Sequence, residues 1–417
     1  MSPKSTSTGA PEAGPQVVRA LQGTARAELW KVLELSTRPG VIAFGIGTPA
    51  ADLFPGEGLD QASHRLGSQF RKTMQYGIPC APLKRQLVEL MARRGVTCRE
   101  EQIFLTTGAQ QAMSLLSHLF LEHGGSVMLE DIVYEGIHNA IKSLAPVVET
   151  VPTHGDRGID LDAVEERLEA GSRPAFLYLI PAGHNPLGVT LDLDQRRRLV
   201  ELSRRFGIPL LEDDAYGFLH HRDETLPALR SFDDQWVFYM GTLSKVMAPA
   251  LRIGWMVIPE EMVPTVSYLK HGNDVDSSTY AQYLVADYLE NVELDDRLRA
   301  VRTTYQQRRD TTLAALERHM PPGIRWNRPE SGMYLWLELP ESIDTMELLT
   351  TAVETEKVAF SPGCAFVAPG QDGRSRHRAH HCLRLCFANF EAAEIEEGIA
   401  RLGRVCERAV GAVVTPS

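Results

Sequence analysis

Residues 240–252 read Met-Gly-Thr-Leu-Ser-Lys-Val-Met-Ala-Pro-Ala-Leu-Arg, and this stretch decides how the rest of the chain is interpreted. Apolar runs flank it, from Trp236 to Met240 and from Ile253 to Ile258. A lysine just past the end of a buried strand can lose water and act as an amine nucleophile toward a carbonyl. Hydroxyls and an arginine close to Lys245 are the groups that an anionic phosphate needs. A solvated loop lysine is the ordinary alternative, so the other segments must decide.

The composition is that of a globular protein rather than a nucleic-acid or membrane protein. Hydrophobic residues make up 43% of the 417 residues and charged residues 23%, which is ordinary for a globular chain. The net charge of −11 argues against a nucleic-acid-binding surface. Six cysteines without a CxxC pair indicate reduced thiols. No stretch is apolar enough to span a bilayer and the N-terminus lacks the order of a secretion signal, so we expect a cytoplasmic protein.

Short apolar runs alternate with helical patterns between about residues 70 and 290. This alternation predicts an α/β fold with a mostly parallel sheet that is covered by helices on both faces. Such a sheet binds ligands at the carboxyl ends of its strands. The expected strands are Gln102–Leu105, Ser126–Leu129, Ala175–Ile180, Pro209–Leu211, Trp236–Met240 and Ile253–Ile258.

The link between the last two expected strands is too short for a parallel connection. It runs from Met240 to Ile253 and contains Gly241 and Pro249. A parallel crossover needs about a dozen residues or more, and usually a helix. We therefore expect the final strand to run antiparallel to its predecessor, which would place Arg252 at the same edge of the sheet as Lys245.

Four of the expected strands end in groups that suit one cofactor. Residues 106–110, Thr-Thr-Gly-Ala-Gln, open a helix whose free N–H groups suit an anion. Tyr134 can stack on a flat ring. Asn185 could bind a phenolic oxygen, and its bond to Pro186 is a candidate for the cis form. Asp213 at a buried strand end needs a cation, such as a protonated pyridine nitrogen. Taken singly, each feature is also explained by a turn, a helix cap or a half-buried tyrosine.

Together these groups describe a site for pyridoxal 5′-phosphate (PLP), and the segments that carry them resemble fold-type I PLP enzymes, specifically the class I/II aminotransferases. The resemblance covers about residues 40–405 and is strongest over residues 241–254, which are similar to the family's lysine signature. Residues 305–310 (Tyr-Gln-Gln-Arg-Arg-Asp) and 331–336 (Ser-Gly-Met-Tyr-Leu-Trp) resemble the subgroup of 2-aminoadipate and kynurenine aminotransferases.

The resemblance assigns a role to each matching residue. Lys245 is implied to bond covalently to the cofactor and then to act as the base, with Asp213 against the pyridine nitrogen, where a neighbouring cation would lower the carboxyl pKa. Arg384 is implied to bind the substrate carboxylate, and Tyr76 to reach the cofactor phosphate of a partner subunit. The other implied contacts are Tyr216 and Asn185 to the phenolic oxygen, Tyr134 to the ring, Ala109, Gln110, Thr242, Ser244 and Arg252 to the phosphate, and Gly45, Ile46 and Gly47 to the substrate.

The pattern along the chain, together with the resemblance, predicts a division into domains. We expect a disordered tail over residues 1–16 and an N-terminal segment over 17–65 that contributes to the small domain and the substrate site. The large PLP-binding domain would span 66–295. A smaller α+β domain would span 296–417, with a helix from Asp295 to His319, strands at Met333–Leu339 and Leu383–Phe387, and a closing helix from Ala392 to Val410.

The implied reaction is the transfer of an amino group between an L-amino acid and a 2-oxo acid by a ping-pong mechanism in a homodimer. A PLP lyase or cyclase on the same scaffold stays open, because His184 and Leu187 depart from the family pattern near the ring. A regulator with a DNA-binding module is a third possibility, for which the N-terminus is too short. His380, His381, Cys382 and Cys386 lack the spacing of a zinc site, so we expect no metal.

Overall fold

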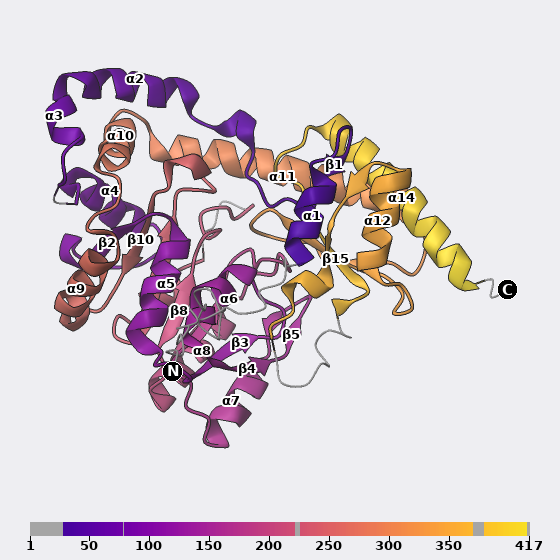
Figure 1. The fold of residues 1–417 in the computed structure, drawn as a ribbon, viewed down its shortest axis with the longest axis horizontal. Coiled ribbons are helices and arrows are strands. Elements are labelled where there is room, and N and C mark those ends of the chain that lie inside the picture. The colour runs from indigo at the N-terminus through magenta and orange to yellow at the C-terminus, as the bar shows by residue number, and fades with distance from the viewer. Residues whose placement is uncertain (1–27, 78, 222–225, 370–378, 415–417) are drawn as a thin grey trace, which may run out of the picture.

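The computed structural model describes residues 28–77, 79–221, 226–369 and 379–414, so the expected tail over 1–16 lies outside the described residues. A seven-stranded sheet, with helices around it, lies at the centre of the larger part of the molecule (Figure 1). Its strand order is β2-β10-β9-β8-β7-β3-β4. The strands are β2 (Ile103–Thr106), β3 (Ser126–Glu130), β4 (Val147–Val151), β7 (Leu177–Leu179), β8 (Leu210–Asp213), β9 (Val237–Thr242) and β10 (Gly254–Val257).

The prediction of a mostly parallel sheet with one reversed strand is confirmed. The pairs from β9 through β8, β7 and β3 to β4 are parallel, and β10 runs antiparallel to both β9 and β2. Thr242 faces Gly254 across the β9–β10 pair, so Arg252 and Lys245 lie at one edge of the sheet. Strand β4 was not predicted, because it is a partly exposed edge strand with polar residues.

Helices cover both faces of this sheet, as the alternation of strand side chains requires. One core cluster joins Val127, Tyr178 and Leu211 to helices α5 (Ala109–Phe120) and α6 (Glu135–Ile141). The other joins Met128, Leu177 and Leu210 to helices α7 (Leu161–Glu169) and α8 (Leu193–Phe206). Successive residues of one strand thus point into opposite layers.

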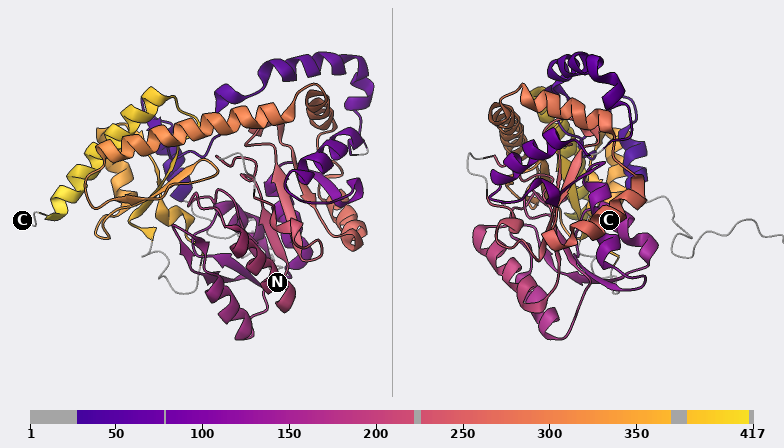
Figure 2. Two further views of the ribbon diagram at one scale, coloured as in Figure 1. Left: turned by 180° about the vertical axis from the view of Figure 1, so that it is seen from behind. Right: turned by 90° about the vertical axis from the view of Figure 1, so that its left-hand side faces the viewer.

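A second, four-stranded sheet lies toward the C-terminus (Figures 1 and 2). Its order is β11-β12-β15-β14, and the adjacent pairs are antiparallel. The 26-residue helix α11 (Leu294–His319) runs from the larger sheet to this part of the molecule and packs on α14 (Ala392–Val414). The other elements are β11 (Arg325–Trp326), β12 (Tyr334–Glu338), α12 (Thr345–Thr355), β14 (Ser361–Pro362) and β15 (Cys382–Cys386).

The N-terminal segment crosses to the C-terminal part of the molecule, where it forms a separate two-stranded sheet. Strand β1 (Ile42–Ala43) pairs in parallel with β13 (Val358–Ala359), and helix α1 (Glu28–Ser36) contacts α12. The chain then returns over the top of the molecule (Figure 1). The remaining helices are α2 (Gly56–Leu66), α3 (Phe70–Thr73), α4 (Ala81–Ala92), α9 (Val263–Asp274) and α10 (Thr279–Glu290). Within the described ranges, no helix is both long and apolar enough to cross a membrane.

Candidate active site

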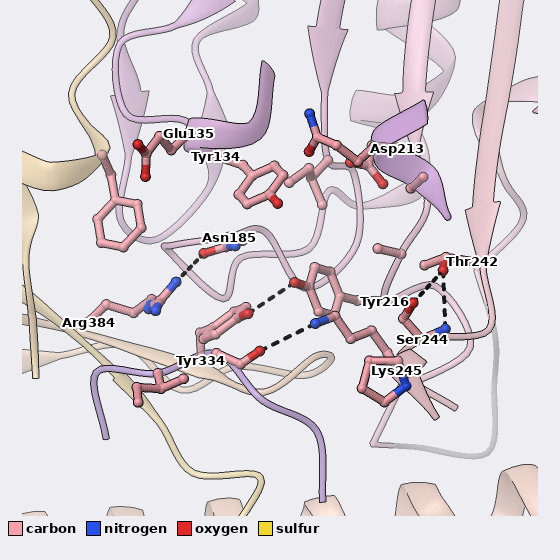
Figure 3. Close-up of a pocket in the computed structure, with 18 of the residues that line it drawn as sticks. Tyr134, Glu135, Asn185, Asp213, Tyr216, Thr242, Ser244, Lys245, Tyr334 and Arg384 are labelled. Carbon is pink, nitrogen blue, oxygen red and sulfur yellow. Dashed lines mark hydrogen bonds between the residues drawn. The ribbon is translucent and has the colours of Figure 1, made fainter. Parts of the chain in front are cut away.

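A cavity of about 360 Å³ opens at the carboxyl ends of the parallel strands (Figure 3). Asp213 is the last residue of β8 and Thr242 the last residue of β9. Tyr134 precedes α6, and Ala109 begins α5. The cavity thus collects side chains from strand ends that are far apart in the sequence. Of the residues predicted for the site, it is lined by Gly45, Ile46, Gly47, Ala109, Gln110, Tyr134, Asn185, Asp213, Tyr216, Thr242, Ser244, Lys245, Arg252 and Arg384.

The buried carboxylate of Asp213 lines the cavity, and only one of its two oxygens has a hydrogen-bond partner among the described residues. The Tyr178 hydroxyl donates a hydrogen bond to its Oδ2 at 2.8 Å, whereas its buried Oδ1 accepts none from the described residues. Burial raises the pKa of Asp213 to about 6, and the Tyr178 hydroxyl opposes this only in part. Burial therefore outweighs both the Tyr178 hydrogen bond and the nearby Lys245 charge, and the pKa of Asp213 stays raised.

Lys245 lies partly buried across the cavity from Asp213. Its Nζ donates a hydrogen bond to the carbonyl oxygen of Gly47 at 3.3 Å. Burial lowers the pKa of Lys245 below its ordinary value, since the charged form loses water there. A larger fraction of this amine is therefore neutral at a given pH, which is what a nucleophile or a base requires.

Hydroxyl and guanidinium groups and the start of helix α5 lie together in the cavity wall that Lys245 also lines. Thr242 Oγ1 lies 2.9 Å from Ser244 Oγ and accepts a hydrogen bond from the Ser244 amide at 3.1 Å. Arg252 adopts a left-handed backbone conformation, with φ of 53°, and its Nη2 donates to the carbonyl oxygen of Thr107 at 2.6 Å. A Cβ on Gly108 would lie 2.5 Å from that Nη2, so only glycine lets the arginine approach the start of α5.

Arg384 defines the opposite side of the cavity and is buried. Its Nη1 donates to Asn185 Oδ1 at 2.7 Å, and its Nη2 donates to the carbonyl oxygen of Gly45 at 2.8 Å. The guanidinium carbon lies 4.5 Å from the centroid of the Tyr334 ring and 4.7 Å from that of Phe366. Its buried Nε has no hydrogen-bond partner among the described residues. This cation is held in place while retaining capacity for an anionic ligand.

The carbonyl groups that meet Lys245 and Arg384 belong to a strap, which we define as residues 45–53. Helix α11 fixes the far end of the strap: the Tyr305 hydroxyl accepts a hydrogen bond from the Ala50 amide at 3.0 Å. Arg308 forms an ion pair with Asp52 at 2.9 Å. Arg297 also donates to the Leu53 carbonyl oxygen. The motif at residues 305–310, to which the sequence assigned no role, therefore holds the segment that borders the cavity.

Some lining residues were not predicted, and one predicted residue lies elsewhere. Tyr76 is 85% exposed and does not line the cavity within this chain. Tyr334 lies in a motif that the sequence singled out, although no role followed from it; Val32 and Phe366 gave no signal, because only long-range packing brings them here. The unpredicted lining residues are Val32, Leu33, Met113, Glu135, Ile180, Ala215, Pro249, Tyr334 and Phe366.

His184 and Leu187, which the sequence places near the ring, lie behind the cavity wall. Neither lines the cavity, and Leu187 packs in a separate apolar cluster with Trp336. His184 Nε2 lies 3.1 Å from Glu130 Oε2, and its Nδ1 accepts a hydrogen bond from the Leu187 amide at 3.3 Å. The bond between Asn185 and Pro186 is cis. The two departures from the family pattern therefore contact the protein around the loop and do not line the cavity.

A mostly parallel sheet whose strand ends surround a partly buried lysine, an acid and an anion site defines a fold-type I transferase of the PLP class. The chain belongs to the aminotransferase class I and II family, whose model matches residues 39–402. It is 37% identical to a 2-aminoadipate transaminase of Thermus thermophilus, over 90% of this chain and 92% of that protein. It is 33% identical to aromatic-amino-acid aminotransferase 1 of Thermococcus litoralis, over 91% of each chain.

The solved structures agree with this assignment. The α-aminoadipate aminotransferase LysN from Thermus thermophilus, in complex with N-(5′-phosphopyridoxyl)-L-leucine, superimposes with a TM-score of 0.83. It is 34% identical to this chain, and the match covers 93% of this chain and 96% of that one. The protein is therefore a PLP-dependent aminotransferase. The residues present fit the cofactor: the orphaned Oδ1 of Asp213 suits a pyridinium nitrogen, and the glycine-lined space at Arg252 suits a phosphate.

Proposed function

We propose that this aminotransferase uses Lys245, Asp213, Tyr216 and Arg384 to move an amino group between an L-amino acid and a 2-oxo acid in two half-reactions. The observation that carries the proposal is their convergence on one cavity. The partly buried amine of Lys245 and the orphaned carboxylate oxygen of Asp213 line that cavity together with a buried arginine, Arg384. This combination supplies a base, an acid partner for a ring nitrogen and an anchor for a carboxylate.

Each group around the cofactor has a position that suits one part of it. Asp213 would face the pyridine nitrogen, and Tyr134 would lie against the ring. Asn185 and Tyr216 would hold the phenolic oxygen. The phosphate would lie at the start of α5, bound by the amides of Ala109 and Gln110 and by the side chains of Thr242, Ser244 and Arg252.

Lys245 would carry the cofactor and, once released by the incoming amine, would move the proton. The bound cofactor supplies a ring that accepts electrons and so weakens the bond between the substrate Cα and its hydrogen. The neutral amine of Lys245 would then accept and move that proton. Its lowered pKa favours this role, because the amine is free to accept a proton without first losing one.

Arg384 would bind the substrate carboxylate and thereby orient the bond that breaks. A guanidinium matches a carboxylate with two parallel hydrogen bonds. Asn185 and the Gly45 carbonyl group hold the arginine from one side, and the rings of Tyr334 and Phe366 lie against it. By fixing the carboxylate, Arg384 would orient the bonds at Cα for the reaction.

The rest of the cavity favours an apolar or aromatic side chain on the substrate. Lys245, Arg252 and Arg384 are the cationic residues of the described lining, and each already has a proposed partner. The remaining wall includes Val32, Leu33 and Ile46, together with Phe366. A second carboxylate on the substrate would lack a cation there, whereas an apolar group would find contact. The relative that acts on aromatic amino acids is therefore the better guide to the donor.

We further propose a cytoplasmic homodimer with the active site at the subunit interface. Tyr76 is exposed in the single chain, as are the nearby Phe70 and Met74. A partner subunit would cover these side chains and receive Tyr76 at its cofactor phosphate. We also propose a division into a segment over 17–65, a large domain over 66–295 and a small domain over 296–417. The pairing of β1 with β13 supports the contribution of the first segment to the small domain.

A screen of half-reactions tests the proposal directly. The purified protein, loaded with PLP, would be mixed with single amino acids, and the conversion of the cofactor to its amine form would be followed by absorbance. We expect fast conversion with aromatic and large apolar donors and slow conversion with acidic ones. Release of ammonia without this conversion would instead establish a lyase.

A further inference from the structure

Tyr334 lies where the cofactor side and the substrate side of the cavity meet. It is the first residue of β12, is 1% exposed, and faces Cys386 across the pair with β15, two residues beyond Arg384. Its hydroxyl oxygen lies 3.1 Å from that of Tyr216 (Figure 3). Its ring centroid lies 4.5 Å from the guanidinium carbon of Arg384. One side chain therefore contacts a residue from each side.

We propose that Tyr334 is a positioning residue, which orients the Tyr216 hydroxyl toward the phenolic oxygen of the cofactor and at the same time supports the guanidinium of Arg384. The inference rests on the proposed function, because it assigns Tyr334 a role through Tyr216 and Arg384. Tyr334 would connect the binding of the substrate carboxylate to the electronic state of the cofactor ring.

The direction of the hydrogen bond between the two phenols follows from their proton count. Each hydroxyl has one proton to donate and can accept in return. When Tyr216 donates to the cofactor, its oxygen can accept the proton of Tyr334. A donor whose own oxygen accepts a hydrogen bond is polarised and becomes a stronger donor. The two rings meet edge to face, at a centroid distance of 5.6 Å and an interplanar angle of 77°, which limits other orientations.

The strap is shaped to admit this hydroxyl. A Cβ on Gly47 would lie 2.6 Å from the Tyr334 hydroxyl oxygen, whereas the next nearest atoms of that ring lie 3.4 Å away. Alanine at position 47 would thus collide with the hydroxyl oxygen and only touch the ring. The glycine at this position is accordingly matched to the tyrosine at 334, and phenylalanine at 334 would remove the collision.

The test is a double-variant cycle, read from the pH at which the visible absorbance of the bound cofactor changes. A hydrogen bond to the ionised phenolic oxygen favours that form, so weakening the bond raises the midpoint. We expect Tyr334→Phe to raise it by on the order of 0.3 pH unit, Tyr216→Phe to raise it further, and the double variant to match Tyr216→Phe. Tyr239→Phe, which removes a buried hydroxyl bonded to Asp214, is the matched control and should not move the midpoint.

A second measurement uses the strap. Gly47→Ala should shift the midpoint and weaken substrate binding, and adding Tyr334→Phe should restore both to the values of Tyr334→Phe alone. Additive shifts in the first cycle, or no rescue in the second, would overturn the role of Tyr334. If the wild-type protein is coloured with PLP, the proposed function would still stand. A wild-type protein that stays colourless with PLP would overturn both.

Discussion

The two sides of the cavity are built in different ways. On the cofactor side, Asp213 and Thr242 end adjacent strands, and the backbone ladder between β8 and β9 fixes them. On the substrate side, Gly45 is held by Arg384, which lies 339 residues further along the chain. The Ala50 amide is held by Tyr305, 255 residues away. The first side is secured by local strand geometry and the second by single side-chain contacts between distant segments.

Because the two sides are held in different ways, a substitution on each side should impair a different property of the enzyme. A change on the cofactor side alters the chemistry, because the backbone around it stays in place. A change on the substrate side alters the position of the strap or of Arg384, and so acts on substrate binding while the cofactor remains bound. The colour of the bound cofactor, kcat and KM together distinguish the two outcomes.

The largest expected effect is on the cofactor side, at Lys245. Lys245→Ala removes both the attachment of the cofactor and the base, so turnover should fall by more than about 10⁴-fold. The characteristic absorbance of the attached cofactor should vanish, and borohydride should leave no label on the peptide that contains residue 245. The thermal unfolding midpoint should stay close to that of the wild type, which separates lost chemistry from lost folding. Substantial remaining turnover would refute the role of Lys245.

On the cofactor side, the buried carboxylate of Asp213 should lower the stability of the folded protein. Its pKa in the folded protein is about 6, above the ordinary 3.8. Between these values the native state keeps a proton that the unfolded chain has lost, so stability falls as pH rises through this window. Above about pH 6 the loss of folding stability reaches its full value of roughly 3 kcal/mol. Asp213→Asn cannot ionise, and without cofactor it should therefore unfold at a higher temperature than the wild type at pH 7.5.

The advantage of the Asp213→Asn variant should disappear below about pH 4, where Asp213 is protonated in both states. PLP should stabilise the wild type more at pH 7.5 than at pH 5, because its ring nitrogen supplies the cation that the carboxylate lacks. Turnover of the variant should fall far more than its affinity for the cofactor. Equal stability of the two proteins at pH 7.5 would contradict the idea that this carboxylate is destabilised by burial.

Arg384 tests the other side of the comparison. Arg384→Lys keeps the positive charge but cannot form two parallel hydrogen bonds to a carboxylate. The substrate carboxylate should therefore be bound less tightly by about 2–3 kcal/mol. This corresponds to a fall in kcat/KM of roughly 30- to 150-fold, mostly through KM. The cofactor should remain bound, so the protein should stay coloured. Arg325→Lys, an exposed residue paired with Glu338 on the same sheet, is the control and should behave as the wild type. Loss of colour in Arg384→Lys would show that the two sides are not separable.

The sequence predicts the cofactor side better than the substrate side for the same physical reason. Asp213, Asn185 and Tyr134 each follow an apolar run, and parallel strands bring such positions to one edge. The contact of Tyr305 with Ala50 depends on how α11 lies against the strap, which no local pattern encodes. The direction of the His184 side chain, away from the cavity lining, depends on its buried partner Glu130, which no local pattern encodes either.

The smallest expected effect lies at the far end of the strap. Tyr305→Phe removes the oxygen that accepts the buried Ala50 amide proton, and an unpaired buried N–H costs about 1 kcal/mol. Because residues 45–47 belong to the same strap, this cost should appear as an increase in KM of about five-fold, with kcat and the cofactor absorbance unchanged. Tyr268→Phe, on the exposed side of α9, should change none of the three. If Tyr305→Phe instead lowered kcat and altered the absorbance, α11 would support the cofactor side as well, and the division between the two sides would not hold.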